Sequence, residues 1–189
     1  MERIRNIHLQ TLTFDYFMNI YLIGFMGSGK SLIGKRLAER LSLNFLDMDD
    51  LLVKKQGMSI ASIFERRGEK YFRQLEANAL RELANVDKTV VATGGGVPCF
   101  SNNMAWMNGD GVTIFLDVPV DVLAKRLENE SATRPLLAGK STKELKLFIK
   151  NKLEERLVDY GKAQFVCHAD APVDTLIDSL GRYFKRFVL

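Results

Sequence analysis

The chain has 189 residues and a formal net charge of +4, with lysines and arginines interleaved with acidic residues along its length. This length fits one domain that can bury a core without disulfides or metals, and the scattered charge favours a small anionic substrate over a nucleic acid. Its two cysteines and two histidines have no paired spacing, which argues against a zinc site or a disulfide framework. The sequence contains neither a signal peptide nor an apolar run of roughly 18 residues, so we expect a cytoplasmic protein without membrane contact.

The first seventeen residues have no clear role in the predicted organisation, because the first buried strand begins directly after Met18. We therefore treat residues 1–17 as an N-terminal extension and residues 18–189 as the functional domain. Met18 is a candidate for the natural start of the protein. N-terminal sequencing of protein from its native source tests this hypothesis, and an intact Met1 or Glu2 end contradicts it.

A strand, a glycine-rich loop and a helix open the domain. Asn19 to Ile23 (NIYLI) are apolar and partly β-branched, as in a strand covered on both faces. Residues 24–31 (GFMGSGKS) match every fixed position of the phosphate-binding pattern G-x-x-x-x-G-K-[ST], whose glycines let backbone N–H groups close around phosphate oxygens. Lys30 adds a cation for the outer phosphates and Ser31 can hold Mg²⁺. The segment therefore predicts binding of ATP or GTP.

Two aspartates follow the second predicted strand, residues 44–46. If the chain stays extended there, Asp47 and Asp49 point to the same side, at the carboxyl edge of the sheet where ligands bind in open α/β folds. One carboxylate could then steady Mg²⁺ through water while the other accepts a proton from an attacking hydroxyl. The alternative is an acidic helix N-terminus, for which Asp50 is the natural candidate.

Helical segments are predicted over residues 51–56, 60–67 and 69–84, with Ser59 as an N-cap and Gly68 as a break. Arg73 and Glu76 are three residues apart on the last of these helices, close enough to pair. An arginine held by an acid at the edge of an apolar face makes a good bidentate receptor for a carboxylate. A surface salt bridge is the alternative.

Three consecutive glycines, Gly94 to Gly96, follow the buried strand Thr89 to Ala92 at the same predicted edge as the phosphate loop. They leave N–H groups open to a ligand and permit close approach, although a tight turn would also need them. Asp117 ends the next strand, residues 112–116, and resembles a metal-binding acid, but Pro119 indicates the start of a helix instead. We therefore consider Asp117 a weaker candidate for a metal-binding acid than Asp47.

The remaining segments complete an alternation of strands and helices. A helix follows Pro119, another covers residues 142–157, a fifth strand covers residues 165–167, and a last helix ends the chain. Residues 129–140 (NESATRPLLAGK) read as a mobile lid that carries one arginine over the transferring phosphate, or as a plain connector. The alternation predicts a parallel sheet with helices on both faces.

Taken in chain order, GFMGSGKS, FLDMD, YFRQLE, TGGGV, RPLL and the arginine of EERLVDY resemble the shikimate kinases, a branch of the nucleoside monophosphate kinase-like P-loop fold. The resemblance runs from Met18 to the C-terminus. It implies a three-layer α/β fold with a five-stranded parallel sheet and a mobile lid. It also implies an enzyme that uses Mg²⁺ and transfers the γ-phosphate of ATP to the 3-hydroxyl of shikimate. An isolated domain with no obvious sticky surface is, separately, compatible with a monomer.

The resemblance also implies roles for individual residues. ATP would be bound by the phosphate loop, at Gly27, Ser28, Gly29, Lys30, Ser31 and Leu32. Two arginines would complete the ATP site: Arg126 would stack on the adenine, and Arg134 would close from the lid onto the phosphoryl group. Ser31 would bind the metal directly and Asp47 through water. Asp49 would bind the hydroxyls of shikimate and orient or deprotonate the 3-hydroxyl. The carboxylate and ring would be held by Arg73, Gly94, Gly95, Gly96 and Arg156, with Glu76 as their support.

Two departures from the family pattern lie near Arg156: Val158 stands where a proline is expected, and Gly161 stands where a bulkier residue is usual. Both concern the positioning of that arginine. Two alternatives to the function remain, namely another small-metabolite kinase of the gluconate or nucleoside monophosphate type, and a nucleotide-binding regulatory module without catalysis. The triple glycine with F-R-x-x-E argues against the first, and intact Asp47, Asp49, Arg73 and Arg134 argue against the second.

Overall fold

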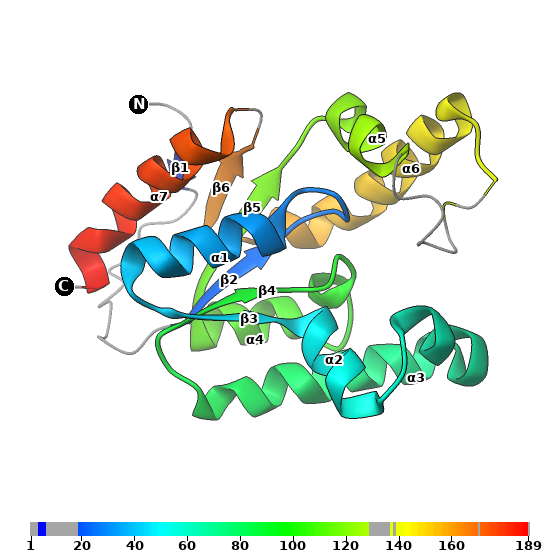
Figure 1. Cartoon of the computed structure of the whole chain (residues 1–189), viewed down its shortest axis with the longest axis horizontal. Coiled ribbons are helices and arrows are strands. Elements are labelled where there is room, and N and C mark those ends of the chain that lie inside the picture. The colour runs from blue at the N-terminus through cyan, green and yellow to red at the C-terminus, as the bar shows by residue number, and fades with distance from the viewer. Residues whose placement is uncertain (1–3, 7–18, 129–136, 138, 170, 189) are drawn as a thin grey trace.

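The computed structural model describes residues 4–6, 19–128, 137, 139–169 and 171–188, and Figure 1 shows their arrangement. Five strands pair in parallel in the order β6-β5-β2-β4-β3. They are β2 (Asn19–Ile23), β3 (Asn44–Asp47), β4 (Thr89–Ala92), β5 (Gly111–Asp117) and β6 (Phe165–His168). All five predicted strands and their parallel pairing are thereby confirmed. The phosphate loop follows the central strand β2, whose two neighbours are β4 and β5, where the strand order reverses and open α/β folds bind ligands.

A sixth strand, β1 (Ile4–Asn6), extends the sheet at its β6 edge. It runs antiparallel, with Ile4 opposite Cys167 and Asn6 opposite Phe165. Sequence reasoning had assigned no structural role to the N-terminal extension. Three of its residues nevertheless contribute a strand to the sheet.

Helices cover both faces of the sheet (Figure 1). Their apolar side chains form two hydrophobic cores with those of the strands. Successive residues of β2 alternate between them, because Ile20 and Leu22 pack in one core and Tyr21 and Ile23 in the other. The first core is covered by α1 (Lys30–Leu41), α5 (Val120–Glu128), α6 (Thr142–Tyr160) and α7 (Val173–Val188), and the second by α2 (Met48–Gln56), α3 (Ile60–Glu82) and α4 (Asn103–Asp110). The fold is therefore the three-layer arrangement that the sequence predicts.

The helix α6 contributes to both cores. Leu145 and Ile149 pack in the first core, whereas Tyr160, in the last turn, packs in the second. The capping box at Ser141 and Glu144 fixes the start of this helix. Its end lies at Tyr160, three residues beyond the predicted boundary of 157.

Local signals place several helix ends as expected. The side chain of Ser59 accepts a hydrogen bond from the backbone N–H of Ser62 and caps α3, and Gly68 interrupts that helix with a φ of 78°. The predicted cap and the predicted break are both confirmed. The helix α4 and the 3₁₀ turns Leu83–Asn85 and Val97–Cys99 had not been predicted. Within the described residues, no helix combines the length and the apolar character that crossing a bilayer requires.

Candidate active site

The phosphate loop lies between β2 and α1, as the sequence predicts. Gly27 and Gly29 adopt φ angles of 78° and 93°, which lie in the region that favours glycine. The ammonium of Lys30 is held inside the loop: its Nζ donates to the carbonyl oxygens of Gly24 and Phe25, each at 2.9 Å, and to Ser28 Oγ at 3.3 Å. The loop is thus shaped around a fixed positive charge.

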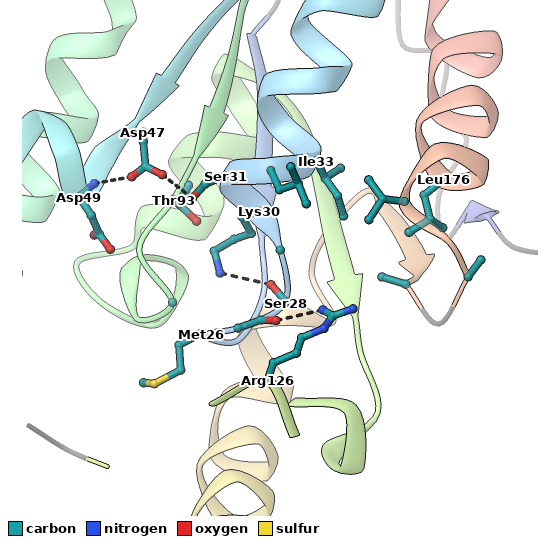
Figure 2. A pocket seen from close by; sticks show the side chains of 17 residues that line it. Met26, Ser28, Lys30, Ser31, Ile33, Asp47, Asp49, Thr93, Arg126 and Leu176 are labelled. Atoms are coloured by element: carbon teal, nitrogen blue, oxygen red, sulfur yellow. Dashed lines mark hydrogen bonds between the residues drawn. The ribbon is translucent and has the colours of Figure 1, made fainter. Parts of the chain in front are cut away.

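A pocket of about 530 Å³ opens in front of this loop (Figure 2). Its polar side is formed by the phosphate loop with Asp47, Asp49, Thr93 and Arg126. Its apolar side is formed by Leu32, Ile33, Ala169, Ala171, Val173 and Leu176. Sequence reasoning had not identified the last four of these residues, because their one signal is an apolar character directly after the last strand, at the carboxyl edge of the sheet.

Ser31 and Asp47 lie side by side at the floor of the pocket. The hydroxyl of Ser31 donates to Asp47 Oδ2 at 2.5 Å, and Asp47 Oδ1 accepts from the backbone N–H of Asp49 at 2.9 Å (Figure 2). A hydroxyl and a carboxylate beside a phosphate loop are hard oxygen donors of the kind that Mg²⁺ binds. The residues present therefore fit a magnesium ion.

The chain does not stay extended after β3, so the reason first given for placing the two aspartates together is wrong. Asp47 is the N-cap of α2, and Asp49 and Asp50 both lie in the first turn of this helix. The acidic helix N-terminus, considered as an alternative, is thus present. Asp47 and Asp49 both line the pocket all the same, because the N-cap and the first turn of α2 lie at the carboxyl edge of the sheet.

The three glycines after β4 lie at the centre of the predicted substrate residues. A Cβ atom on Gly94 would lie 2.7 Å from Glu76 Oε1 and 3.1 Å from Asp49 Oδ1. On Gly96 it would lie 2.5 Å from Arg73 Nη1, and on Gly95 it would lie 3.4 Å from Arg156 Nη1. The loop does contain a turn, with Val97 N–H bonded to the carbonyl of Gly94. The absence of side chains, however, is what lets the surrounding charged groups approach.

Arg73 and Glu76 form a buried pair and not a surface salt bridge. Arg73 Nη1 lies 2.5 Å from Glu76 Oε2, and the Glu76 side chain is 2% exposed. Glu69 accepts two further hydrogen bonds from the same guanidinium. Phe100 faces the guanidinium at 4.5 Å, and Phe72 and Phe64 lie at 5.3 and 5.8 Å. Burial raises the pKa of Glu76 to about 7, while Arg73 acts in the opposite direction.

Arg156 reaches the other side of the glycine triplet from α6. Its Nη1 donates to the carbonyl oxygen of Gly95 at 3.2 Å, and its guanidinium lies 5.4 Å from the centre of the Phe25 ring in the phosphate loop. The departures at positions 158 and 161 leave this helix intact, since Val158 is 71% exposed and Gly161 N–H bonds to the carbonyl of Leu157. Arg156 therefore lies beside the glycine triplet without the expected proline.

Arg126 donates from Nη1 to the carbonyl oxygen of Gly27 at 3.0 Å and borders the pocket opposite Leu176 (Figure 2). Asp117 pairs instead with Nδ1 of His168, at 3.1 Å, and is not one of the pocket-lining residues, which agrees with its lower rank. Arg134 and most of the predicted lid lie outside the described residues. Of that segment the structure describes Leu137, which is buried in the first core, and residues 139–140.

Comparison with known proteins gives a consistent result. The family model described as shikimate kinase matches residues 26–182. A shikimate kinase of Phocaeicola vulgatus is 46% identical over 172 residues, which cover 88% of this chain and 98% of that protein. The crystal structure of shikimate kinase from Bacteroides thetaiotaomicron is 38% identical with a TM-score of 0.85, and covers 89% of this chain and 99% of its own.

A third relative is the shikimate kinase from Acinetobacter baumannii, solved in complex with shikimate. It is 31% identical, with a TM-score of 0.82, over 92% of this chain and 96% of its own. The family model covers well over half of the present sequence, and these relatives match it over most of their own lengths. The chain belongs to the shikimate kinase family.

Proposed function

We propose that this protein is an ATP-dependent kinase that transfers the γ-phosphoryl group of ATP to the 3-hydroxyl of shikimate. The observation that carries the proposal is the position of Gly95. A Cβ atom there would lie 3.3 Å from the backbone nitrogen of Met26 in the phosphate loop and 3.4 Å from Arg156 Nη1. One residue thus adjoins both a phosphate cradle and an arginine suited to an anionic acceptor, which is the arrangement that a two-substrate kinase requires.

The nucleotide half of the site consists of the loop from Gly27 to Leu32 and the pocket in front of it. Backbone N–H groups of the loop and Lys30 suit the phosphates. The apolar residues that follow β6 offer a wall for the adenine, and Arg126 borders the same pocket. Arg134, expected to close onto the phosphoryl group, belongs to this half as a proposal from the family resemblance.

Mg²⁺ belongs to the same half. Ser31 would hold the ion directly and Asp47 through water, in agreement with their position beside each other at the pocket floor. When bound, the ion neutralises negative charge on the phosphate oxygens.

The acceptor half is supported by the residues around the glycine triplet. Arg73 and Arg156 approach Gly96 and Gly95 respectively, and both guanidiniums suit the carboxylate of shikimate. Glu76 holds Arg73 in place through its buried carboxyl group. Because Gly94 has no side chain, Asp49 and Glu76 can approach it closely. A hydroxyl of shikimate beside Gly94 would therefore meet the Asp49 carboxylate.

The chemical step follows from these positions. The 3-hydroxyl oxygen of shikimate forms a bond to the γ-phosphorus, the bond from that phosphorus to the bridging oxygen breaks, and ADP leaves. Asp49 orients the hydroxyl and accepts its proton. Lys30 supplies positive charge to the transferring group, as Arg134 would from the lid, because phosphoryl transfer depends chiefly on alignment and charge neutralisation. A monomer as the working unit stays a proposal.

A coupled assay of ADP release with MgATP and three acceptors tests the proposal. We expect turnover with shikimate and none above background with gluconate or AMP, because their carboxylate or phosphate group is not placed to meet Arg73 and Arg156 while a hydroxyl meets Asp49. Turnover with gluconate or AMP but not with shikimate would indicate another small-metabolite kinase. Silence with all three would favour the non-catalytic module.

A further inference from the structure

Tyr160 is a buried tyrosine that the proposed mechanism does not use. It lies in the last turn of α6, is fully buried, and packs its ring against Phe115 at 5.1 Å between ring centres. Its hydroxyl donates to the carbonyl oxygen of Gly95 at 2.5 Å. Tyr160 does not line the pocket, whereas Gly95, whose carbonyl its hydroxyl bonds to, does.

The same carbonyl oxygen also accepts the hydrogen bond from Arg156 Nη1 at 3.2 Å. Arg156 and Tyr160 are four residues apart, and therefore lie on one face of α6, one helical turn from each other. A Cβ atom on Gly95 would lie 3.3 Å from the backbone nitrogen of Met26 and 3.4 Å from the carbonyl oxygen of Gly24. Gly95 thus adjoins the phosphate loop and, through its carbonyl group, bonds to the end of α6.

A carbonyl oxygen has two lone pairs, and here two donors use them. The hydrogen bond from the Tyr160 hydroxyl holds the Gly95 carbonyl in place. One N–H of Arg156 bonds to the same carbonyl, so the guanidinium is oriented by a fixed acceptor. Without that hydroxyl, the carbonyl of Gly95 would keep the hydrogen bond from Arg156 but lose the one from Tyr160, and both the loop and the guanidinium could shift. Burial raises the pKa of the phenol, with Arg156 acting in the opposite direction, so Tyr160 remains a donor at neutral pH.

The end of α6 needs such an anchor in this chain. Val158, which occupies the position where the family resemblance leads us to expect a proline, is 71% exposed and is absent from both hydrophobic cores. Tyr160 is the residue of that last turn that reaches the second core. We propose that Tyr160 is a positioning residue, whose hydroxyl fixes the glycine triplet and Arg156 relative to each other for binding of the acceptor carboxylate. This inference rests on the proposed function.

The experiment compares two buried tyrosines. Tyr160→Phe removes the hydroxyl but keeps the ring against Phe115, so the fold should persist. We expect KM for shikimate to rise about 5- to 10-fold, the scale of one lost hydrogen bond, while KM for ATP stays within about twofold. The control is Tyr21→Phe, because Tyr21 is also fully buried and its hydroxyl donates to Asp110 Oδ2 at 2.5 Å, away from the pocket.

Urea unfolding should show that both variants lose stability, whereas only Tyr160→Phe should change KM for shikimate. An unchanged KM in Tyr160→Phe, or an equal rise in both variants, would overturn the inference. If the wild-type protein does not phosphorylate shikimate at all, the proposed function fails instead, so the two failures are distinguishable.

A second arm asks whether Tyr160 acts through Arg156. In the Arg156→Lys background, which lacks the planar fork, the additional effect of Tyr160→Phe on KM should shrink to less than about twofold. Full additivity of the two substitutions would show that the hydroxyl acts independently of Arg156, and would contradict the assigned role.

Discussion

Asp49 has a carboxylate that can accept a proton and a backbone N–H that is held by a hydrogen bond. It lies in the first turn of α2, and its N–H bonds to the cap residue Asp47. Its Oδ1 would lie 3.1 Å from a Cβ atom on Gly94, in the glycine triplet. The Asp49 carboxylate therefore lies between Asp47, proposed to hold the metal, and the glycine triplet beside the acceptor arginines. A base for the attacking hydroxyl is needed at this place.

Replacement of Asp49 by asparagine should remove the base while keeping the shape of the side chain. We expect kcat with shikimate to fall by about 10²-fold or more, with KM for ATP little changed. Asp50→Asn is the matched control, since Asp50 lies in the same helical turn but does not line the pocket. Steady-state kinetics of both variants decide the matter, and an Asp49→Asn enzyme with a nearly wild-type rate would remove Asp49 from catalysis.

Glu76 should make stability depend on pH. Because burial raises its pKa from the ordinary 4.5 to about 7, the folded state holds this proton more tightly than the unfolded state. The resulting stabilisation is complete below about pH 4.5 and is lost as the pH rises through about 7. Relative to Glu76→Gln, the wild-type protein should therefore lose about 3 kcal/mol of unfolding free energy over this interval.

Urea unfolding of the wild-type protein and of Glu76→Gln across this pH interval measures the difference in unfolding free energy between them. The contributions of other titrating groups cancel in this difference. Glutamine keeps an oxygen for Arg73, so the contact can persist without the charge. Parallel stability curves for the two proteins would show that Glu76 titrates as an ordinary carboxyl.

At the scale of elements, the glycine triplet allows a sharp comparison. Gly96→Ala places a methyl group against the Arg73 guanidinium, with Nη1 at 2.5 Å and Cζ at 2.8 Å. The arginine must move, so we expect KM for shikimate to rise about 10-fold or more with KM for ATP unchanged. Gly109→Ala serves as the control, because its added methyl group meets nothing within 4 Å.

Gly109 lies inside the helix α4, where alanine should stabilise the protein by about 0.5–1 kcal/mol and leave both KM values as they are. Wild-type kinetics for Gly96→Ala would mean that Arg73 is not part of the acceptor site. Lowered shikimate affinity in both variants would point to a general effect on the fold.

The elements that sequence reasoning predicted are those with strong local signals. The strands of the parallel sheet are short apolar runs, the phosphate loop has a fixed pattern, and Ser59 and Gly68 mark their helix boundaries by capping and by positive φ. The helix α4 was missed because Asn103, Asn108 and Gly109 weaken its apolar pattern within eight residues. The helical start after Asp47 was missed because Asp47, Asp49 and Asp50 are all of a residue type that can cap a helix, and the sequence does not show which of them does so.

The candidate site was predictable in its parts but not in its connections. Arg73, Glu76 and the glycine triplet were identified from residue type and spacing, whereas the bond from Tyr160 to Gly95 joins residues 65 positions apart. Nothing local marks such a contact. The apolar wall after β6 was missed for the same reason. Ala169 and Leu176 line the pocket only because α7 packs against α1 in the folded chain.

At the scale of the whole molecule, the N-terminal extension contributes a strand at one edge of the sheet. Its strand β1 pairs with β6 at the edge of the sheet, far along the strand order from β3 and β4. Removal of residues 1–17 should therefore leave kcat and both KM values within about twofold of the full chain. Because the truncation exposes the edge of β6, size-exclusion chromatography should show more self-association. Loss of activity in a truncated chain that remains folded would mean that the extension belongs to the functional domain.

In the proposed function, the site presents ATP from one side of the glycine triplet to an anionic acceptor on the other. The central claim is that the 3-hydroxyl oxygen of shikimate receives the phosphoryl group. The most direct measurement is ³¹P and ¹H NMR of the product formed from MgATP and shikimate. We expect one phosphomonoester coupled to the ring hydrogen at carbon 3, formed in equal amount with ADP. Phosphate on another hydroxyl, or ADP without phosphorylated shikimate, would contradict the proposed transfer.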